Sequence, residues 1–400
     1  MKNIKFILFL LIGFGTLLSC TEPYELSSDF FEEQIVIEAS ITNRFENQRI
    51  KISKTYPIDS TIYQPSTGDV SVKIKNEQGL EFIFSYNEEK EAYFSEQPFK
   101  AQPDTEYTLE VVSNEDIYTA TSILTTETVL ASLNAQKTTN QDGVEGLEVV
   151  ANSYDPSGTS QYYRFIYEET YKVTAPYWSN KKATVTEIPP EEVWLDPTYE
   201  IGWEIDEDIY TERCYKTNYY QQPVLTQTLS LNEDRLTNFP VKFIPKTNYS
   251  INERYSIKVT QYVETFDAYN FYKTLNNLSS SGEILSPNQP GFVKGNIKAS
   301  SDPNKKVIGF FDVVATSSKR IYFNHQDFFE GEPLPPYFID CDIIGLSKGI
   351  PSERFRLISN INTDYLHLFQ PDGEIYWMVK PRCSDCAIYA NPEPPEFWEE

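Results

Sequence analysis

Short segments in which apolar and polar residues alternate dominate this chain. In residues 34–41 (QIVIEASI), the side chains of Ile35, Ile37 and Ile41 fall on one face, which is the period-two pattern of a half-buried β-strand. Segments with a similar strand-like pattern recur at 49–54, 70–75, 80–86, 107–112 and 118–124. Turn-forming residues separate these segments, and short strands at this spacing predict a β-sandwich over residues 34–126.

One strand of this region carries a more specific pattern. Residues 102–111 read QPDTEYTLEV and resemble the P-x-T-x-Y-x-L-x-V run of fibronectin type III and related immunoglobulin-like sandwiches. In those sandwiches the tyrosine closes a corner between strands by hydrogen bonding back to the chain. The resemblance implies this role for Tyr107 and an Ig/fibronectin-III-like fold for the N-terminal β-sandwich. Such domains serve as spacers and docking modules, so the fold alone assigns no chemistry.

The second region, residues 127–400, is larger and again rich in strands. Residues 127–144 show no clear strand pattern, and we therefore place the domain boundary near Thr126. Strand patterns follow at 146–153, 161–170, 224–231, 254–263, 307–315 and 319–323. One segment, 265–278, has apolar residues at helical spacing, with Thr265 as a candidate N-cap. The sequence therefore predicts a mainly all-β protein, in which the N-terminal sandwich is followed by a larger β-rich domain with one short helix.

The N-terminus carries an export pattern. Residues 1–19 contain Lys2 and Lys5 and then an apolar run that is too short for a stable membrane span. The run ends in Leu-Leu-Ser-Cys, which resembles a bacterial lipobox with Cys20 as the lipidated first residue of the mature chain. We expect residues 1–19 to be a lipoprotein signal peptide and the polar residues 20–33 to be a tether. An uncleaved signal anchor is the alternative.

Composition constrains the partners of the chain. The formal net charge is −25 at pH 7, because 59 acidic residues outnumber 34 basic ones. Such a chain repels phosphate backbones and anionic lipid surfaces, which argues against nucleic-acid binding. Membrane affinity would then come from the N-terminal lipid. The 28 Tyr and 25 Phe suit pleated sheets, and 25 Pro against 16 Gly favour turns and edge strands over long helices.

The cysteines other than Cys20 are candidates for disulfide bonds. They are Cys214, Cys341, Cys383 and Cys386, and an even number in an exported chain favours disulfides. The sequence does not distinguish among the possible pairings. Cys383 and Cys386 form a C-x-x-C pair, but no second close pair completes a zinc pattern, and no βαβ pattern accompanies a redox motif. Structural disulfides are the preferred interpretation, with a zinc site or free thiols as alternatives.

Candidate catalytic groups are sparse. His325 and His367 belong to no H-E-x-x-H or paired-histidine pattern, and the sequence has no G-x-S-x-G, P-loop or G-x-G-x-x-G motif. Acidic residues are abundant, but a carboxylate pair for glycoside hydrolysis is defined by its spacing in three dimensions. No D-x-D-x-D-G calcium loop is present. We therefore assign no catalytic residue, no metal site and no cofactor.

Three tryptophans form a candidate ligand-binding cluster. Trp178, Trp194 and Trp203 lie within one stretch that is rich in proline and acidic residues. Aromatic side chains on loops can form a platform for sugars or peptides, because a flat apolar face with a polar rim matches such ligands. Packing in the core or on strands is the alternative for these residues.

Several blocks of the second region follow one another in a characteristic order. They are residues 214–231, 254–259, 268–272 (AYNFY), 295–297 (GNI), 307–311 (VIGFF), 383–386 (CSDC) and 395–398 (PEFW). This series resembles the domain-of-unknown-function family 4249, which is found in lipoproteins of the Bacteroidota. The blocks span most of the second region, and the N-terminal sandwich is compatible with the family's architecture. One departure is the segment 387–390 (AIYA), where the family usually has glycines, and it affects the shape of that loop.

The resemblance implies a location and a role rather than a reaction. Members of the family look like outer-membrane lipoproteins, often encoded beside TonB-dependent transporters, and have no assigned catalytic residues. We therefore expect a non-enzymatic protein, anchored by lipid on the periplasmic or cell-surface side of the outer membrane, that assists such a transporter in nutrient uptake. A glycan-active enzyme with paired carboxylates and a structural or adhesive surface protein are the alternatives.

Overall fold

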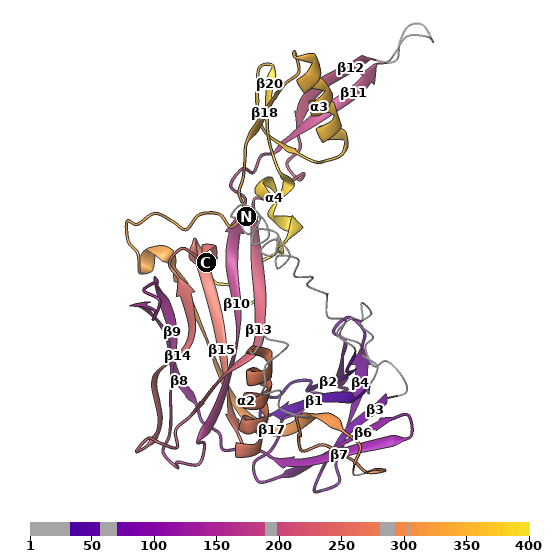
Figure 1. The fold of residues 1–400 in the computed structure, drawn as a ribbon, viewed down its shortest axis with the longest axis vertical. Helices are drawn as coiled ribbons and strands as arrows, with labels where there is room; N and C mark the ends of the chain where they lie inside the picture. Colours follow the sequence, from indigo (N-terminus) through magenta and orange to yellow (C-terminus); the bar gives the residue numbers. More distant parts are fainter. Residues whose placement is uncertain (1–32, 57–69, 189–197, 281–292, 303) are drawn as a thin grey trace, which may run out of the picture.

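The fold is mainly β, which confirms the fold class expected from the sequence. A sandwich of long strands has a second sandwich beside its lower end and a small unit above its upper end (Figure 1). The computed structural model describes residues 33–56, 70–188, 198–280, 293–302 and 304–400. We call the parts the base sandwich, the middle sandwich and the head. In the residues so described, no helix is both long and apolar enough to span a membrane.

The base sandwich combines the N-terminal strands with a much later part of the chain. Its strands are β1 (Ile35–Thr42), β2 (Arg49–Lys54), β3 (Val70–Asn76), β4 (Glu81–Asn87), β5 (Ala92–Ser95), β6 (Glu106–Ser113), β7 (Asp116–Ile123), β16 (Lys298–Ala299) and the first part of β17 (Val307–Asn324). Its core packs Ile37 and Leu109 together with Ile297, Phe311 and Val313. Residues beyond 34–126 therefore complete this sandwich.

The middle sandwich packs two sheets face to face. One sheet contains β8 (Leu130–Thr139), β9 (Glu145–Asp155) and β14 (Asp234–Pro245). The other contains β10 (Tyr162–Thr174), β13 (Arg213–Gln227), β15 (Arg254–Glu264) and the second part of β17. Side chains such as Leu147, Phe165 and Ile257 fill the space between the sheets. The short 3₁₀ turns η1 (Tyr249–Ile251) and η2 (His325–Asp327) follow the ends of β14 and β17.

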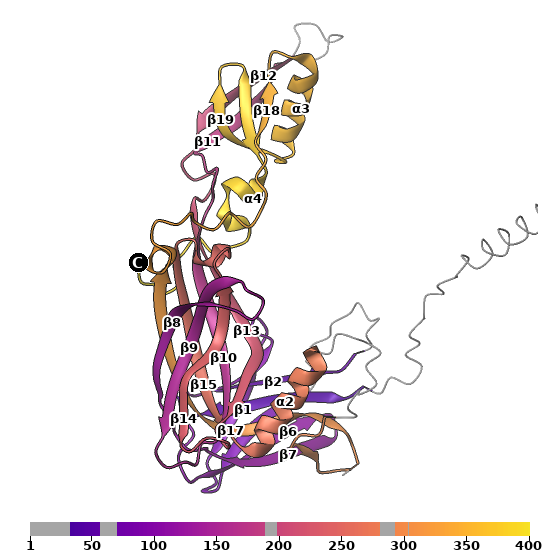
Figure 2. The ribbon, with the colours of Figure 1, turned by 60° about the vertical axis from the view of Figure 1, so that its left-hand side comes forward.

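Strand β17 joins the two sandwiches. Its residues from Val307 to Val314 pair in parallel with β1, and those from Ala315 to Asn324 pair antiparallel with β15. The result is one continuous 12-stranded sheet with the order β13-β10-β15-β17-β1-β2-β5-β4-β3-β6-β7-β16. Helix α2 (Phe266–Ser280) covers the sheet where the two sandwiches meet (Figure 2). The passage from β7 to β8, which contains Thr126, is a second connection between them.

Most of the expected elements are confirmed. The strand segments expected over 34–124 correspond to β1–β4, β6 and β7, and the expected helix at 265–278 is α2. Tyr107 is buried, and its hydroxyl accepts the N–H of Gln102 at 2.9 Å, which confirms the tyrosine corner. The two strands expected at 307–315 and 319–323 are one strand, β17.

Other elements were not expected from the sequence. Strand β8 runs through residues 130–139, within the stretch where no strand was expected. A bulge between Leu130 and Ser132 interrupts the alternation of this strand, so its sequence pattern is weak. Helix α3 (Pro351–Asn362) is a second substantial helix. Its apolar residues do not mark a single buried face, since Leu357 is buried while Phe355 is 74% exposed.

The head stands at the far end of the molecule from the base sandwich (Figure 1). Its elements are β11 (Lys181–Ile188), β12 (Thr198–Ile205), β18 (Ile344–Ser347), α3, β19 (His367–Asp372) and β20 (Ile375–Val379). A core of its own includes Leu346, Leu357 and Met378. The short helix α4 (Pro381–Ser384) and the turn η3 (Cys386–Ile388) lie between the head and the middle sandwich and form a neck with the adjoining strand ends.

Candidate functional site

A cavity of about 800 Å³ lies where the base sandwich meets the middle sandwich. It is lined by residues of β1, β10, β15 and β17 on the sheet and by α2, which runs beside these strands in Figure 2. Small-molecule sites in proteins commonly enclose roughly 300–1,000 Å³. We call this space the junction cavity.

The alternation along β1 explains the sheet wall of the junction cavity. Ile35 and Ile37 point into the core of the base sandwich, so Val36 points to the opposite face and lines the cavity. Ile308 stands opposite Val36 in the parallel pairing of β1 with β17 and extends the wall, together with Phe310. Glu38, Ser40 and Thr42 share the face of Val36 on β1 and add polar surface to the same wall.

A buried ion cluster borders the cavity. Arg164 on β10 lines the cavity and is only 8% exposed. Its Nε donates to Oε1 of Glu264 at 2.5 Å, and its Nη2 lies 3.6 Å from Oδ2 of Asp312. The rings of Tyr262 and Tyr272 lie 4.0 Å and 4.2 Å from the guanidinium carbon. Two carboxylates and two rings thus hold this guanidinium in one orientation.

Burial shifts the protonation of this cluster. It raises the pKa of the Glu264 carboxyl to about 7, against the lowering effect of Arg164. Burial also raises the pKa of Asp312, whose carboxylate accepts the Tyr272 hydroxyl at 3.0 Å. Oε2 of Glu264, Oδ1 of Asp312 and Nη2 of Arg164 have no hydrogen-bond partner among the described residues. With both acids ionised, the cluster carries one formal negative charge.

The geometry of the cluster suits binding better than acid–base catalysis. Arg164 lines the junction cavity, whereas Glu264 and Asp312 are fully buried beside it and are not part of its lining. A catalytic carboxyl group must come within hydrogen-bond reach of the substrate. The cavity therefore offers a bound molecule apolar surface, the buried guanidinium of Arg164, and the charged side chains of Arg49, Glu38 and Glu46.

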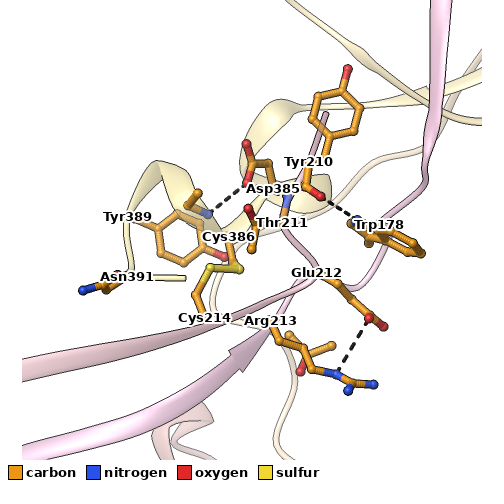
Figure 3. The surroundings of a disulfide bond; sticks show 12 residues. Trp178, Tyr210, Thr211, Glu212, Arg213, Cys214, Asp385, Cys386, Tyr389 and Asn391 are labelled. Carbon is orange, nitrogen blue, oxygen red and sulfur yellow. Dashed lines mark hydrogen bonds and ion pairs between the residues drawn. A yellow bond between two sulfur atoms is a disulfide. The ribbon is translucent and has the colours of Figure 1, made fainter. Parts of the chain in front are cut away.

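The neck contains both disulfide bonds found in the described residues, and Figure 3 shows the surroundings of the first. Cys214, at the start of β13, is bonded to Cys386 of η3, with a Cα–Cα distance of 5.8 Å. Around it, the N–H of Thr211 donates to Oδ1 of Asp385 at 3.1 Å, and the N–H of Cys386 donates to the carbonyl of Thr211 at 3.1 Å. Backbone and side-chain hydrogen bonds thus reinforce the covalent link between the C-terminal segment and β13.

The second disulfide joins Cys341 to Cys383, also with a Cα–Cα distance of 5.8 Å. Both bonds fall in the segments that connect the head to the middle sandwich. The disulfide interpretation is therefore confirmed, and the structure selects one pairing, Cys214 with Cys386 and Cys341 with Cys383. No thiolate of these four residues remains for zinc.

A serine, a histidine and an aspartate also meet in the neck. Nδ1 of His367 lies 2.7 Å from Oγ of Ser384, and its Nε2 lies 3.3 Å from Oδ1 of Asp364. Ser384 is fully buried, and its hydroxyl also donates to the carbonyl of Pro381 at 3.2 Å. Tyr210 stacks on the imidazole at 4.0 Å. A nucleophile must reach its substrate, so this group fixes the neck rather than attacking a bond.

The tryptophans singled out in the sequence lie near the neck and in the head. The indole Nε1 of Trp178 donates to the carbonyl of Tyr210 at 2.9 Å, and its ring packs on the core of the middle sandwich (Figure 3). Trp203 lies on β12 opposite Ala183 and is 44% exposed. Trp194 and the lipidation candidate Cys20 lie outside the described residues. The ligand-platform interpretation and the lipid attachment remain predictions.

His325, the other histidine, is buried against Phe329, and burial lowers its pKa. Neither of its ring nitrogens has a hydrogen-bond partner among the described residues. Within the described ranges, no three His, Cys, Asp or Glu side chains come together as a metal site.

The junction cavity and its ion cluster were not found from the sequence. Arg164 stands between two core residues, Tyr163 and Phe165, in a strand-like segment, and that position is the one local signal. Its partner Glu264 is 100 residues away along the chain. Only the pairing of β10 with β15, and of β15 with β17, brings the three charged residues together.

Comparison with known proteins identifies one family. The family model described as "Domain of unknown function (DUF4249)" matches residues 21–320, which is 300 of the 400 residues. The match includes both sandwiches except the last residues of β17, and it includes β11 and β12 of the head. No curated protein matches the chain.

Proposed function

The chain belongs to the family of the domain of unknown function DUF4249, and from this premise we propose that it is a lipid-anchored outer-membrane protein that binds a small molecule and assists a TonB-dependent transporter in nutrient uptake. Lipid attachment would be at Cys20. The protein would act by binding and presentation, without a reaction of its own.

The junction cavity is the observation that carries the binding part of this proposal. Its volume of about 800 Å³ suits a small molecule, and its lining combines apolar side chains with Arg164. The surrounding strands belong to both sandwiches through β17, so the walls are held by the most extensive sheet of the fold. A rigid frame of this kind favours preorganised binding.

Two further features support export and an extracytoplasmic site of action. The Cys214–Cys386 and Cys341–Cys383 bonds are typical of oxidising compartments. The strongly acidic chain has little electrostatic attraction to an anionic membrane, so a lipid at Cys20 would supply the attachment.

Purification from native membranes in mild detergent tests the transporter part. The full-length protein should co-purify with an outer-membrane barrel transporter, whereas Cys20→Ser should be released into the soluble fraction and lose that partner. Repeated purification of wild type without a barrel, or membrane retention of Cys20→Ser, would contradict the proposal. Hydrolysis of glycans by the purified chain would instead favour the enzyme alternative.

A further inference from the structure

The lining of the junction cavity restricts the ligand to a mainly apolar molecule. Val36, Ile166, Leu275, Ile308 and Phe310 contribute apolar surface from β1, β10, α2 and β17. Burial of apolar surface stabilises a complex, so these walls favour a hydrocarbon-like body. They come from the sheet and from helix α2.

Two amide side chains in the lining, those of Gln48 and Asn276, are already engaged by the protein. Oε1 of Gln48 accepts the N–H of Thr42 at 2.9 Å, and Nε2 of Gln48 donates to the carbonyl of Phe99 at 2.8 Å. Nδ2 of Asn276 donates to the carbonyl of Pro223 at 2.6 Å. These amides therefore have little hydrogen-bonding capacity left for a ligand.

Arg164 differs from these two amides because it retains an unused donor, as does the Ser40 hydroxyl. A guanidinium has five N–H groups; Nε serves Glu264, and Nη2 is buried without a hydrogen-bond partner in the described part of the chain. The distance of 3.6 Å from Nη2 to Asp312 is beyond a normal hydrogen bond. Tyr262 and Tyr272 lie over the guanidinium, so its N–H edge is the part that can meet a ligand.

Charge determines what kind of acceptor this donor can receive. Arg164 is already matched by two carboxylates, Glu264 and Asp312, which leave one net negative charge when both are ionised. The other charged residues of the lining are Arg49, Glu38 and Glu46, and Glu46 is paired with Arg44 at 3.5 Å. An anionic ligand would add negative charge where negative charge already prevails. A neutral carbonyl, ester or hydroxyl oxygen can accept the N–H without that penalty.

We propose that the junction cavity binds a neutral, mainly apolar molecule whose carbonyl or hydroxyl oxygen accepts a hydrogen bond from Arg164. This ligand class rests on the binding role proposed above and defines it chemically. Arg164 positions the polar end of the ligand, and the walls from β1, β17 and α2 enclose its apolar body.

Fluorescent probes of matched shape test this assignment on the purified full-length chain. Prodan is a neutral naphthalene ketone, N-phenylnaphthylamine is neutral without a carbonyl, and anilinonaphthalene sulfonate is the anionic relative of the second probe. Prodan should bind saturably at one site with a blue-shifted emission, and the sulfonate should bind at least tenfold more weakly than N-phenylnaphthylamine. Equal or tighter binding of the sulfonate would overturn the proposal.

Two variants locate the site. Val36→Trp fills the cavity from its β1 wall and should weaken both neutral probes at least tenfold, whereas Ile83→Trp, a matched change on an exposed position of β4, should leave them unchanged. Arg164→Lys keeps the charge but loses the planar donors, and it should weaken prodan about tenfold with less than a twofold effect on N-phenylnaphthylamine. The assignment is refuted if Arg164→Lys weakens the binding of both probes equally, or if Val36→Trp weakens the binding of neither.

The controls keep this test separate from the transporter proposal. Circular dichroism confirms that each variant is folded, and Val36→Trp carries the test if Arg164→Lys does not fold. The titrations contain no transporter, so a failure to bind the probes removes the ligand class but leaves the co-purification result standing. Loss of the barrel partner alone would leave the ligand class intact.

Discussion

Arg164 lies at the centre of the buried ion cluster and also lines the junction cavity. Buried ion pairs are costly to desolvate, and removing one partner leaves the other charge unpaired in a medium of low dielectric constant. Here the guanidinium is stabilised by Glu264, Asp312 and the rings of Tyr262 and Tyr272, yet it keeps an unpartnered Nη2 among the described residues. A cluster that is stabilised but incompletely hydrogen-bonded is typical of a site that receives a ligand.

Glu264→Gln tests the electrostatics of this cluster. The carboxyl has a folded-state pKa of about 7 against an ordinary value of 4.5, so the folded protein binds more protons than the unfolded chain between these values. The free energy of unfolding therefore falls as the pH rises from 4.5 to 7, by roughly 3 kcal/mol from this group. Urea denaturation across this pH range should show that the wild-type decline is reduced in Glu264→Gln.

The exposed residue Glu89 provides the control for this measurement. Glu89→Gln should follow the wild-type dependence on pH. A raised pKa at Glu264 is contradicted if Glu264→Gln shows the same dependence of unfolding free energy on pH as wild type. It is also contradicted if wild type becomes more stable relative to Glu264→Gln as the pH rises.

Strand β17 determines how the two sandwiches are joined, because it pairs with both β1 and β15. Two glycines permit its close approach to neighbouring chain segments. Gly309 has a φ of +145°, and an added Cβ would lie 2.0 Å from the carbonyl oxygen of Ile37 on β1; at Gly295 an added Cβ would lie 1.5 Å from the carbonyl oxygen of Gly309. Asn296 then accepts the N–H of Phe311 at 2.8 Å and donates to its carbonyl at 2.7 Å. Two blocks that carry the family resemblance therefore contact each other.

Gly309→Ala should disrupt the pairing of β1 with β17. The new methyl group meets backbone on a paired strand, which has little freedom to move, and we expect a loss of roughly 4 kcal/mol or more. Gly143→Ala is the matched control, since Gly143 also has a positive φ, of +80°, but nothing within 4 Å of an added Cβ. It should cost about 1–2 kcal/mol. Similar losses of unfolding free energy in the two variants would show that the close approach is unimportant.

The neck disulfides should contribute unequally to stability. The Cys214–Cys386 bond spans 172 residues and the Cys341–Cys383 bond spans 42. Chain entropy then makes replacement of the first pair by alanine costlier, by about 1 kcal/mol, within a total of roughly 2–5 kcal/mol for such a bond. Urea denaturation of the two double-alanine variants measures this difference. An equal or reversed order would contradict the entropic account.

The sequence predicted elements where alternation is regular and local. Strands β1 to β4, β6, β7 and β15 and helix α2 follow from period and spacing alone. Strand β8 contains a bulge, and α3 exposes Phe355, so their patterns are blurred. The sharing of β17 and the meeting of Arg164 with Glu264 and Asp312 depend on pairing between distant segments, and single-sequence periodicity carries no information about such pairing.

At the scale of the whole molecule, the base and middle sandwiches are interdependent. Strand β17 belongs to both, and the core of the base sandwich contains Ile297, Phe311 and Val313. A fragment limited to residues 33–126 would leave β1 without its parallel partner and part of this core open. The head, in contrast, has a separate core and is joined to the rest through the disulfide-linked neck.

The fragment of residues 33–126 should therefore not fold alone. Its amide proton spectrum should be poorly dispersed, and its thermal unfolding should not be cooperative. Adding residues 293–314 after residue 126 through a flexible linker should restore dispersion and a cooperative transition. A stable, well-dispersed fragment without the added segment would contradict the interdependence.

We propose that this fold holds a neutral apolar ligand in the junction cavity. Native mass spectrometry of the protein purified from its own membranes in mild detergent would detect such a ligand. We predict one additional neutral, mainly apolar molecule per wild-type chain, with the adduct retained in Ile83→Trp and lost in Val36→Trp. A bare chain mass in wild type, or an adduct that persists in Val36→Trp, would contradict the account.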